Sequence, residues 1–227
     1  MAGVESAEAA PLMDAPASQG GRLGSGDAAV QRLRDALSRL AQETRARPRN
    51  GLTHHDADET VGTFGTDDAM GFDPLPLLRA LHEFGAQVVV IGQVAGIMHG
   101  SRELTGDLDL LWDGQAGRSD ALAAGFASVS AELTDDDGVP LRCNAAAFDL
   151  PKVLFRSPGA SGDCCTPALP WKDLPIADFL TRCEVARADG FEIRYLHRAD
   201  LIRMRRVAGR VKDHRRADEL ERLSSHL

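Results

Sequence analysis

The spacing of apolar residues changes along the chain, and each spacing predicts a different kind of element. Residues 27–47 carry large apolar side chains every three or four positions, which is the period of one face of an amphipathic helix. The residues before them are rich in Ala, Gly, Ser and Pro, and we expect that part to be disordered. Residues 48–72 show no sustained period. They are typical of a linker, and we interpret "THHDADE" within them as solvated rather than metal-binding.

After residue 72 the pattern alternates between the two periods. Short apolar or alternating runs predict strands at 86–91, 107–112, 151–156, 162–166 and 191–196. Helical spacing and capping residues predict helices at 73–85, 93–100, 119–133, 176–190, 198–210 and 213–223. We therefore predict an N-terminal extension, residues 1–72, with one helix in an otherwise partly disordered segment. An α/β (α+β) domain follows at residues 73–227 and ends in a helical segment.

Composition and charge narrow the class of protein. The chain has 227 residues, of which 43% are hydrophobic and 26% charged, as is ordinary for a globular protein. A formal net charge of −8 argues against a protein that coats nucleic acid without sequence preference. No apolar run approaches the roughly 20 residues that span a bilayer, and the four cysteines form no C-x-x-C pair. We expect a cytoplasmic protein without a membrane partner.

Two aspartates stand one residue apart in the strand predicted at residues 107–112. Side chains alternate across a strand, so Asp107 and Asp109 face the same side of it. Two carboxylates this close repel each other, and one takes up a proton unless a cation neutralises the pair. Mg²⁺ prefers hard oxygen ligands, commonly one or two carboxylates plus the phosphates of a substrate. The pair therefore predicts a magnesium site.

A glycine ends the apolar strand that precedes this pair. Gly92 is followed by a helical segment of small residues, and a strand–glycine–helix turn presents backbone N–H groups that can bind phosphate. The sequence "GQVAG" does not complete G-x-G-x-x-G, so it does not predict a dinucleotide-binding fold. A phosphate-binding turn close to paired carboxylates favours a site for a metal and a nucleotide.

The order of these motifs resembles a known superfamily. A strand that ends at Gly92, then "HGSRELTGDLDLL", then a later strand with another aspartate, is similar to the DNA-polymerase-beta-like nucleotidyltransferases. The chain looks most like small bacterial members such as the AbiEii-type toxins. The resemblance covers roughly residues 73–222 and includes "ADLIRMRRVAGRVKDHRRADEL". It implies a nucleotidyltransferase-type mixed sheet flanked by helices.

The resemblance also implies a role for each acidic residue. Asp107 and Asp109 would hold two Mg²⁺ ions around the triphosphate of an NTP. A third carboxylate would bind the metal nearer the acceptor and help to deprotonate the acceptor hydroxyl. Asp163 matches this third position best, because it follows a glycine-rich turn and begins a β-like run. Asp149 is the competitor, but it stands just before a proline and looks more like a loop residue.

The nucleotide-binding residues implied by the resemblance are Gly92, Gln93, Arg102, Thr105, Arg210 and Lys212. The chain departs from the family pattern at Gln93, where the family has a second small residue. A bulky side chain there either narrows the passage for the triphosphate or donates a hydrogen bond to it. Arg205 stands where similar sequences often have Lys. We expect Asp213 to be the N-cap of the last helix.

These observations predict a metal-dependent nucleotidyltransferase that transfers a nucleoside monophosphate from an NTP to a hydroxyl acceptor. The acceptor class stays open between RNA, a protein and a small molecule, and the resemblance includes toxin-type enzymes with a cognate antitoxin. Two alternatives also stay open. One is a catalytically silent member of the fold that binds a nucleotide or a protein. The other is an interaction module whose N-terminal helix pairs with another chain.

Overall fold

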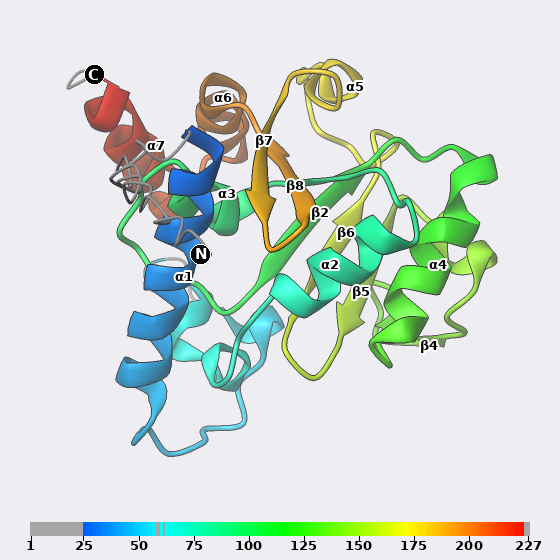
Figure 1. Ribbon diagram of the computed structural model, residues 1–227, viewed down its shortest axis with the longest axis horizontal. Coiled ribbons are helices and arrows are strands. Elements are labelled where there is room, and N and C mark those ends of the chain that lie inside the picture. The colour runs from blue at the N-terminus through cyan, green and yellow to red at the C-terminus, as the bar shows by residue number, and fades with distance from the viewer. Residues whose placement is uncertain (1–24, 58–59, 61, 225–227) are drawn as a thin grey trace, which may run out of the picture.

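In the part of the chain that the structure describes, one mixed sheet of eight strands forms the centre (Figure 1). The structure is a computed structural model, and it describes residues 25–57, 60 and 62–224. The strand order is β4-β3-β5-β6-β2-β1-β8-β7. The strands are β1 (Val88–Val90), β2 (Leu108–Trp112), β3 (Glu132–Thr134), β4 (Pro140–Leu141), β5 (Lys152–Arg156), β6 (Ser161–Cys165), β7 (Cys183–Ala188) and β8 (Phe191–Leu196).

The middle of the sheet brings two distant strands side by side. Strand β2 pairs antiparallel with β1 on one side and parallel with β6 on the other. In the β2–β6 ladder Asp109 lies opposite Asp163, and Leu111 lies opposite Cys165. Residues in register on neighbouring strands point to the same face of a sheet. The carboxylates of β2 and β6 therefore share one face.

Helices cover both faces of the sheet. The long helices are α1 (Ser25–Thr44), α2 (Leu75–Glu83), α3 (Gly92–Met98), α4 (Ser119–Ser128), α6 (Arg198–Ala208) and α7 (Val211–Ser224). The short helices are α5 (Ile176–Phe179), η1 (His54–Asp56), η2 (Thr63–Gly65), η3 (Asp67–Ala69), η4 (Ala116–Arg118) and η5 (Ala145–Asp149). Helices α2 and α4 pack together on the face opposite the carboxylates, where Phe126 of α4 stacks on Phe148 and contacts Phe155. Helices α3, α6 and α7 pack near the carboxylates.

Helix α1 belongs to the same core as the sheet. Its apolar stripe is buried, with Leu33 and Leu40 at 0% and 2% exposure, and the helix packs against α3 and β7. Arg32 Nε also donates to the carbonyl oxygen of Met98 at 2.8 Å, at the end of α3. The helix predicted at residues 27–47 is confirmed, but the boundary expected between residues 72 and 73 does not divide the core. The disorder expected before residue 25 lies outside the described residues.

The linker expected at residues 48–72 is also packed in its described part. Thr63 and Ala69 are buried, and the three short helices η1 to η3 connect α1 to the edge of the acidic face. Short polar segments of this kind give little periodic signal, because single residues rather than a continuous face make the contacts. The extension is therefore a structural part of the protein from Ser25 onward.

The helix predicted at residues 176–190 is wrong. Only one turn forms (α5), and the chain then enters β7, which pairs antiparallel with β8 over six residue pairs. The turn between these strands is Asp189-Gly190, and both residues have positive φ angles, +44° and +88°. An Asp-Gly pair between alternating runs is a strong hairpin signal, and here it outweighs the helical spacing. The helix predicted at 119–133 likewise ends at Ser128, before β3.

The predicted fold class is confirmed. The described chain forms a mixed sheet with helices on both faces, and it ends in two helices, α6 and α7. All four cysteines are free thiols. None of the helices in the described ranges is both long and apolar enough to cross a membrane.

We expect the docking of α1 to be essential for stability. Leu33→Ala should lower the free energy of unfolding by about 2–5 kcal/mol, because it leaves a cavity under a fully buried side chain. Urea denaturation measures the change. Ser38→Ala on the exposed side of α1 is the matched control and should stay within about 0.5 kcal/mol of the wild type. Equal stability of the two variants would show that α1 is not part of the folding unit.

Candidate functional site

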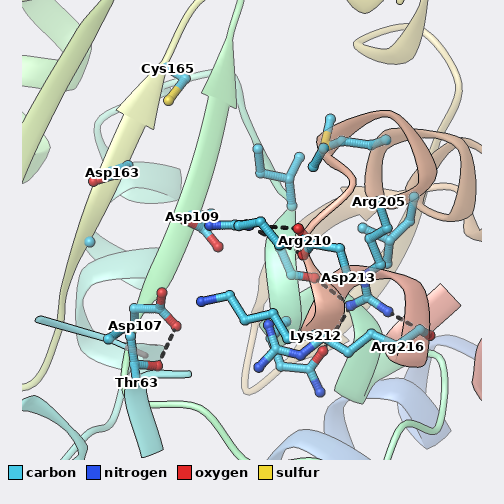
Figure 2. Close-up of a pocket in the computed structure, with 18 of the residues that line it drawn as sticks. Thr63, Asp107, Asp109, Asp163, Cys165, Arg205, Arg210, Lys212, Asp213 and Arg216 are labelled. Carbon is cyan, nitrogen blue, oxygen red and sulfur yellow. Dashed lines mark hydrogen bonds and ion pairs between the residues drawn. The ribbon is translucent and has the colours of Figure 1, made fainter. Parts of the chain in front are cut away.

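Three carboxylates lie on one face at the centre of the sheet. Asp109 is in β2, Asp163 is its register partner in β6, and Asp107 stands two residues before Asp109 on the same side. They line one cavity of about 400 Å³ together with residues of α3, α6 and α7. Figure 2 shows the three aspartates on neighbouring strands, with α7 on the other side of the cavity. The structure thus brings together the three acidic residues that the sequence singled out.

Asp109 is the most constrained of the three. A Cβ atom built on Gly92 would lie 1.8 Å from Asp109 Oδ2, so the carboxylate packs directly against the glycine backbone. Gly92 also has a φ angle of +63°, which disfavours any side chain. Burial raises the pKa of Asp109 well above its ordinary value, and the nearby Asp107 and Asp163 carboxylates add to the effect. Gly92 is therefore needed first of all to make room for a buried carboxyl group.

Asp107 is held by two threonine hydroxyls. Thr105 Oγ1 donates to Asp107 Oδ1, and Thr63 Oγ1 donates to the same oxygen at 2.9 Å. Both hydroxyls are buried, and they lie 2.8 Å from each other. Thr105, expected to bind nucleotide, therefore orients a carboxylate. Thr63 was missed because it lies in the segment interpreted as a linker, where no motif marks it.

Cations face the carboxylates from the start of α7. Arg210 and Lys212, which we expect to contact phosphate, line the cavity, and Arg216 joins them one turn later. Arg210 Nε donates to Asp213 Oδ2 at 2.6 Å, and Arg216 Nε donates to Glu103 Oε1 at 2.7 Å. Asp213 lies within the first turn of α7 rather than at its N-cap, because the helix already begins at Val211. Its carboxylate positions Arg210 instead.

Lys212 differs from the other cations of the site. The residue is 7% exposed, yet its side chain forms no ion pair or hydrogen bond with the part of the chain that the structure describes. Burial lowers the pKa of Lys212, and the neighbouring Arg210 and Arg216 lower it further. The carboxylates of Asp107 and Asp213 oppose this lowering of the pKa, and an anion in the cavity would stabilise the ammonium group further. Lys212 is therefore well suited to bind a phosphate group.

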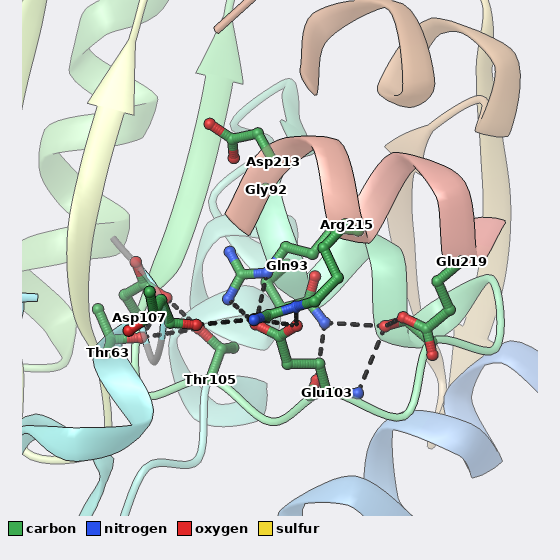
Figure 3. Close-up of polar contacts among 12 residues, drawn as sticks. Thr63, Gly92, Gln93, Glu103, Thr105, Asp107, Asp213, Arg215 and Glu219 are labelled. Atoms are coloured by element: carbon green, nitrogen blue, oxygen red, sulfur yellow. Dashed lines mark hydrogen bonds and ion pairs between the residues drawn. The ribbon is translucent and has the colours of Figure 1, made fainter. Parts of the chain in front are cut away.

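Gln93 lines the cavity, and its amide group is held by neighbouring residues. The residue is 2% exposed, and its amide nitrogen donates to Ser101 Oγ at 3.0 Å and to the carbonyl oxygen of Glu103 at 2.7 Å. Its amide oxygen accepts from Arg205 Nη2 at 2.8 Å. These bonds join α3, the loop that follows it and α6. Figure 3 shows Gln93 and Glu103 with Arg215 and Glu219 of α7 beside them. Gln93 is therefore a structural link in this arrangement, and the two roles expected for it at a triphosphate stay predictions.

Arg205 is the centre of the same network. Besides Gln93 it donates to the carbonyl oxygens of Gly92 at 3.1 Å and Arg216 at 3.0 Å. Burial and the nearby Arg216 lower the pKa of Arg205 to about 10. A Cβ on Gly96 would lie 2.4 Å from Arg205 Nη2, so the close approach requires a glycine there. Arg205 thus connects the Gly92 turn to the helix that carries the cations.

Two candidates from the sequence lie elsewhere. Arg102 is exposed and lines a separate groove beside α1, with Arg39 and Phe64, so it does not reach the carboxylates. Asp149, the competitor for the third carboxylate, ends η5 in an exposed position outside the acidic cavity. The neighbour of Asp109 is Asp163, as the sequence favoured.

His54 is a cavity residue that the sequence pattern did not reveal. Its Nδ1 lies 3.2 Å from Asp68 Oδ2, and its Nε2 lies 4.0 Å from Asp163 Oδ1. Asp68 also pairs with Arg156 at 3.1 Å. Although burial opposes it, hydrogen bonds from His54 lower the pKa of Asp68. "THHDADE" therefore supplies a residue beside the third carboxylate, a role that its polar composition does not distinguish from a solvated loop.

The carboxylates fit a divalent cation that a substrate helps to hold. Asp109 is buried between two other carboxylates, and this repulsion is relieved when a cation binds. Within the described ranges no three His, Cys, Asp or Glu side chains form a complete metal site. The donor set offered is therefore a pair of carboxylates open to phosphate oxygens, which is how Mg²⁺ commonly binds.

No protein-family model matches the chain, and no curated protein matches it significantly. The function is therefore inferred from the geometry of the site and from the motifs of the sequence.

We expect Asp109→Asn to stabilise the metal-free protein in a pH-dependent way. Below the ordinary carboxyl pKa of about 3.9 both states of the wild type are protonated, so variant and wild type should be equally stable. As the pH rises, the unfolded wild type releases its proton first, because the folded-state pKa is raised. The wild type therefore loses about 1.4 kcal/mol for each unit of difference between the two pKa values, and the variant does not.

Urea denaturation in EDTA at pH 4 and pH 7.5 measures this difference. Asp149→Asn is the matched control, since it makes the same change at an exposed carboxylate. The control should follow the wild type at both pH values. A stability gain in Asp109→Asn that is the same at both pH values would contradict an elevated pKa.

We expect Gln93→Met to destabilise the protein without improving nucleotide binding. The change keeps the volume but leaves Arg205, Ser101 and the Glu103 carbonyl each one partner short, which should cost about 1–3 kcal/mol of unfolding free energy. Gln87→Met is the matched control, because Gln87 is exposed and accepts a single bond from Arg194. Tighter NTP binding by Gln93→Met in calorimetry would show that Gln93 obstructs the cavity after all.

Proposed function

We propose that the protein is a metal-dependent nucleotidyltransferase, which moves a nucleoside monophosphate from an NTP to a hydroxyl group. The observation that carries the proposal is the arrangement of Asp107, Asp109 and Asp163 on one sheet face of a cavity. Lys212 lines the same cavity and has no ion-pair partner among the described residues. Carboxylates on one side and cations on the other suit a polyphosphate bound with divalent metal. The order of motifs along the chain supports the same proposal.

The cationic side of the cavity binds and orients the triphosphate. The ammonium group of Lys212 has no hydrogen-bond or ion-pair partner among the residues that the structure describes and binds a phosphate, while Arg210 is held towards the cavity by Asp213. Arg205 and Gln93 fix the position of the start of α3 relative to α7. The phosphates are thereby placed against the carboxylate face, and positioning accounts for much of the catalysis in phosphoryl transfer.

The acidic side holds the metal and receives the acceptor. Asp107 and Asp109 are the ligands, with the threonine hydroxyls of residues 63 and 105 orienting Asp107. Bound Mg²⁺ supplies neutralisation of the charge that develops on the attacking and leaving oxygens. Asp163, with 29% of its side chain exposed, is open to the acceptor and takes the proton of its hydroxyl. The hydroxyl oxygen forms a bond to the α-phosphorus, the bond to the bridging oxygen breaks, and pyrophosphate leaves.

Removal of single carboxylates should separate binding from transfer. Asp109→Asn should abolish both the Mg²⁺-dependent rise in melting temperature with NTP and all transfer, because a metal ligand is lost. Asp163→Asn should keep most of the NTP-dependent shift and lose transfer by about 10²-fold or more, because it serves the acceptor. The measurements are melting curves with and without Mg²⁺ and NTP, and labelling of cell extract with α-³²P-NTP.

Asp149→Asn is again the control and should behave as the wild type in both assays. If Asp109→Asn binds Mg²⁺ and NTP like the wild type, the carboxylates are not a metal site and the proposal fails. If wild-type protein binds NTP but labels no component of the extract, the protein is a nucleotide-binding member without transfer activity.

A further inference from the structure

The sheet face that carries the carboxylates changes from acidic to apolar along the strands. In β2 the residues on this face are Asp107, Asp109 and then the fully buried Leu111, and in β6 Asp163 is followed by Cys165. Successive residues on one face are about 6.6 Å apart along a strand. Figure 2 accordingly shows Cys165 at the opposite end of the group from Asp107 and Thr63. The cavity is therefore charged at one end and apolar at the other.

Two segments form the walls of this apolar end. Leu169 and Trp171 lie in the segment that follows β6, and Met204 and Ala208 belong to α6. Lys172 Nζ donates to the carbonyl oxygen of Val207 at 2.6 Å and ties the two walls together. We call the space between them the apolar slot, defined by Leu169, Trp171, Met204 and Ala208. It is continuous with the acidic face, since all four residues line the same cavity as Asp109.

The side chains of the apolar slot offer almost nothing for hydrogen bonding. The only strong donor among them is the indole nitrogen of Trp171, and it already donates to the carbonyl oxygen of Thr166 at 2.8 Å. Cys165, at the base of the slot, is kept as a neutral thiol because burial raises its pKa. The indole is thus anchored by its edge, and Met204 provides an adaptable apolar surface. Such a slot favours a flat aromatic group through stacking and dispersion.

We infer that the apolar slot binds the nucleobase of the NTP by stacking against Trp171, without distinguishing one base from another by side-chain hydrogen bonds. The inference rests on the proposed function, because that function places the triphosphate at the charged end of the same cavity. A nucleotide matches this cavity, because it has an apolar aromatic ring at one end and anionic phosphates at the other. Recognition then comes mainly from the phosphates, and all four common NTPs are substrates.

Calorimetric titration of the full-length protein tests this inference. The probes are the Mg²⁺ complexes of ATP, GTP, CTP, UTP and inorganic tripolyphosphate, which carries the charge without a base. We expect the four NTPs to bind within about tenfold of one another, and each at least about tenfold tighter than tripolyphosphate, since stacking on one aromatic side chain gives an effect of this order. Trp171→Ala should lose this advantage for all four and leave tripolyphosphate binding unchanged.

Two further variants serve as controls. Trp171→Phe retains an aromatic face and should keep most of the advantage of NTP over tripolyphosphate. Phe84→Ala truncates an exposed aromatic residue at the end of α2, outside the cavity, and should bind every probe as the wild type does. Unchanged tripolyphosphate binding by Trp171→Ala also shows that this variant is folded. If it is not folded, Trp171→Phe and Met204→Ala replace it in the comparison of NTP with tripolyphosphate.

The possible failures are distinguishable. If tripolyphosphate binds and NTPs bind no tighter, or if Trp171→Ala binds NTPs like the wild type, the base lies elsewhere and the inference fails while the proposed function stands. If one NTP binds more than about tenfold tighter than the other three, the slot reads the base and the inference fails, because stacking alone does not produce such a preference. If neither the NTPs nor tripolyphosphate bind, the proposed function fails as well.

Discussion

The mutual repulsion of buried carboxylates is the constraint on which the centre of this protein depends. Asp109 lies between Asp107 and Asp163 and packs against the backbone of Gly92, where no larger residue fits. Such a cluster remains folded only if its surroundings compensate for it. The compensation comes from threonine hydroxyls on Asp107 and from the cations that α7 presents across the cavity. The sheet, the Gly92 turn and the last helix are therefore adapted to one another.

Much of the fold and the acidic part of the site follow from local sequence pattern. The strand bearing Asp107 and Asp109, the turn at Gly92 and the choice of Asp163 over Asp149 all follow from features within a few residues of each position. The alternation of side chains along a strand places the first two carboxylates on one face, and strand pairing then adds the third. The local sequence pattern predicts these positions well because the strands that carry the aspartates are buried and short.

The remaining features of the site depend on contacts between residues that are far apart in the sequence, which no local pattern indicates. A motif comparison treats Gln93 as a bulky residue in a phosphate loop, but the partners that turn it away lie in the following loop and in α6. Thr63 and His54 have no pattern around them, since each acts as a single side chain from an irregular segment. The β7–β8 hairpin has a local signal in Asp189-Gly190, but the helical spacing of the apolar residues before it favours a helix. In such cases strand pairing determines the structure, even where the local sequence favours a helix.

The contacts that complete the acidic face join parts of the chain that are made at very different times. Thr63 and Asp107 are 44 residues apart, Gln93 and Arg205 are 112 apart, and Glu103 and Arg216 are 113 apart. Closing such loops costs entropy that only the nearly complete fold repays. A nascent chain that still lacks α7 would hold Asp107 and Asp109 without the cations that this helix presents, whereas Asp163 already has Lys152 at 3.9 Å. The order of synthesis thus delays assembly of the acidic face until α7 has been made.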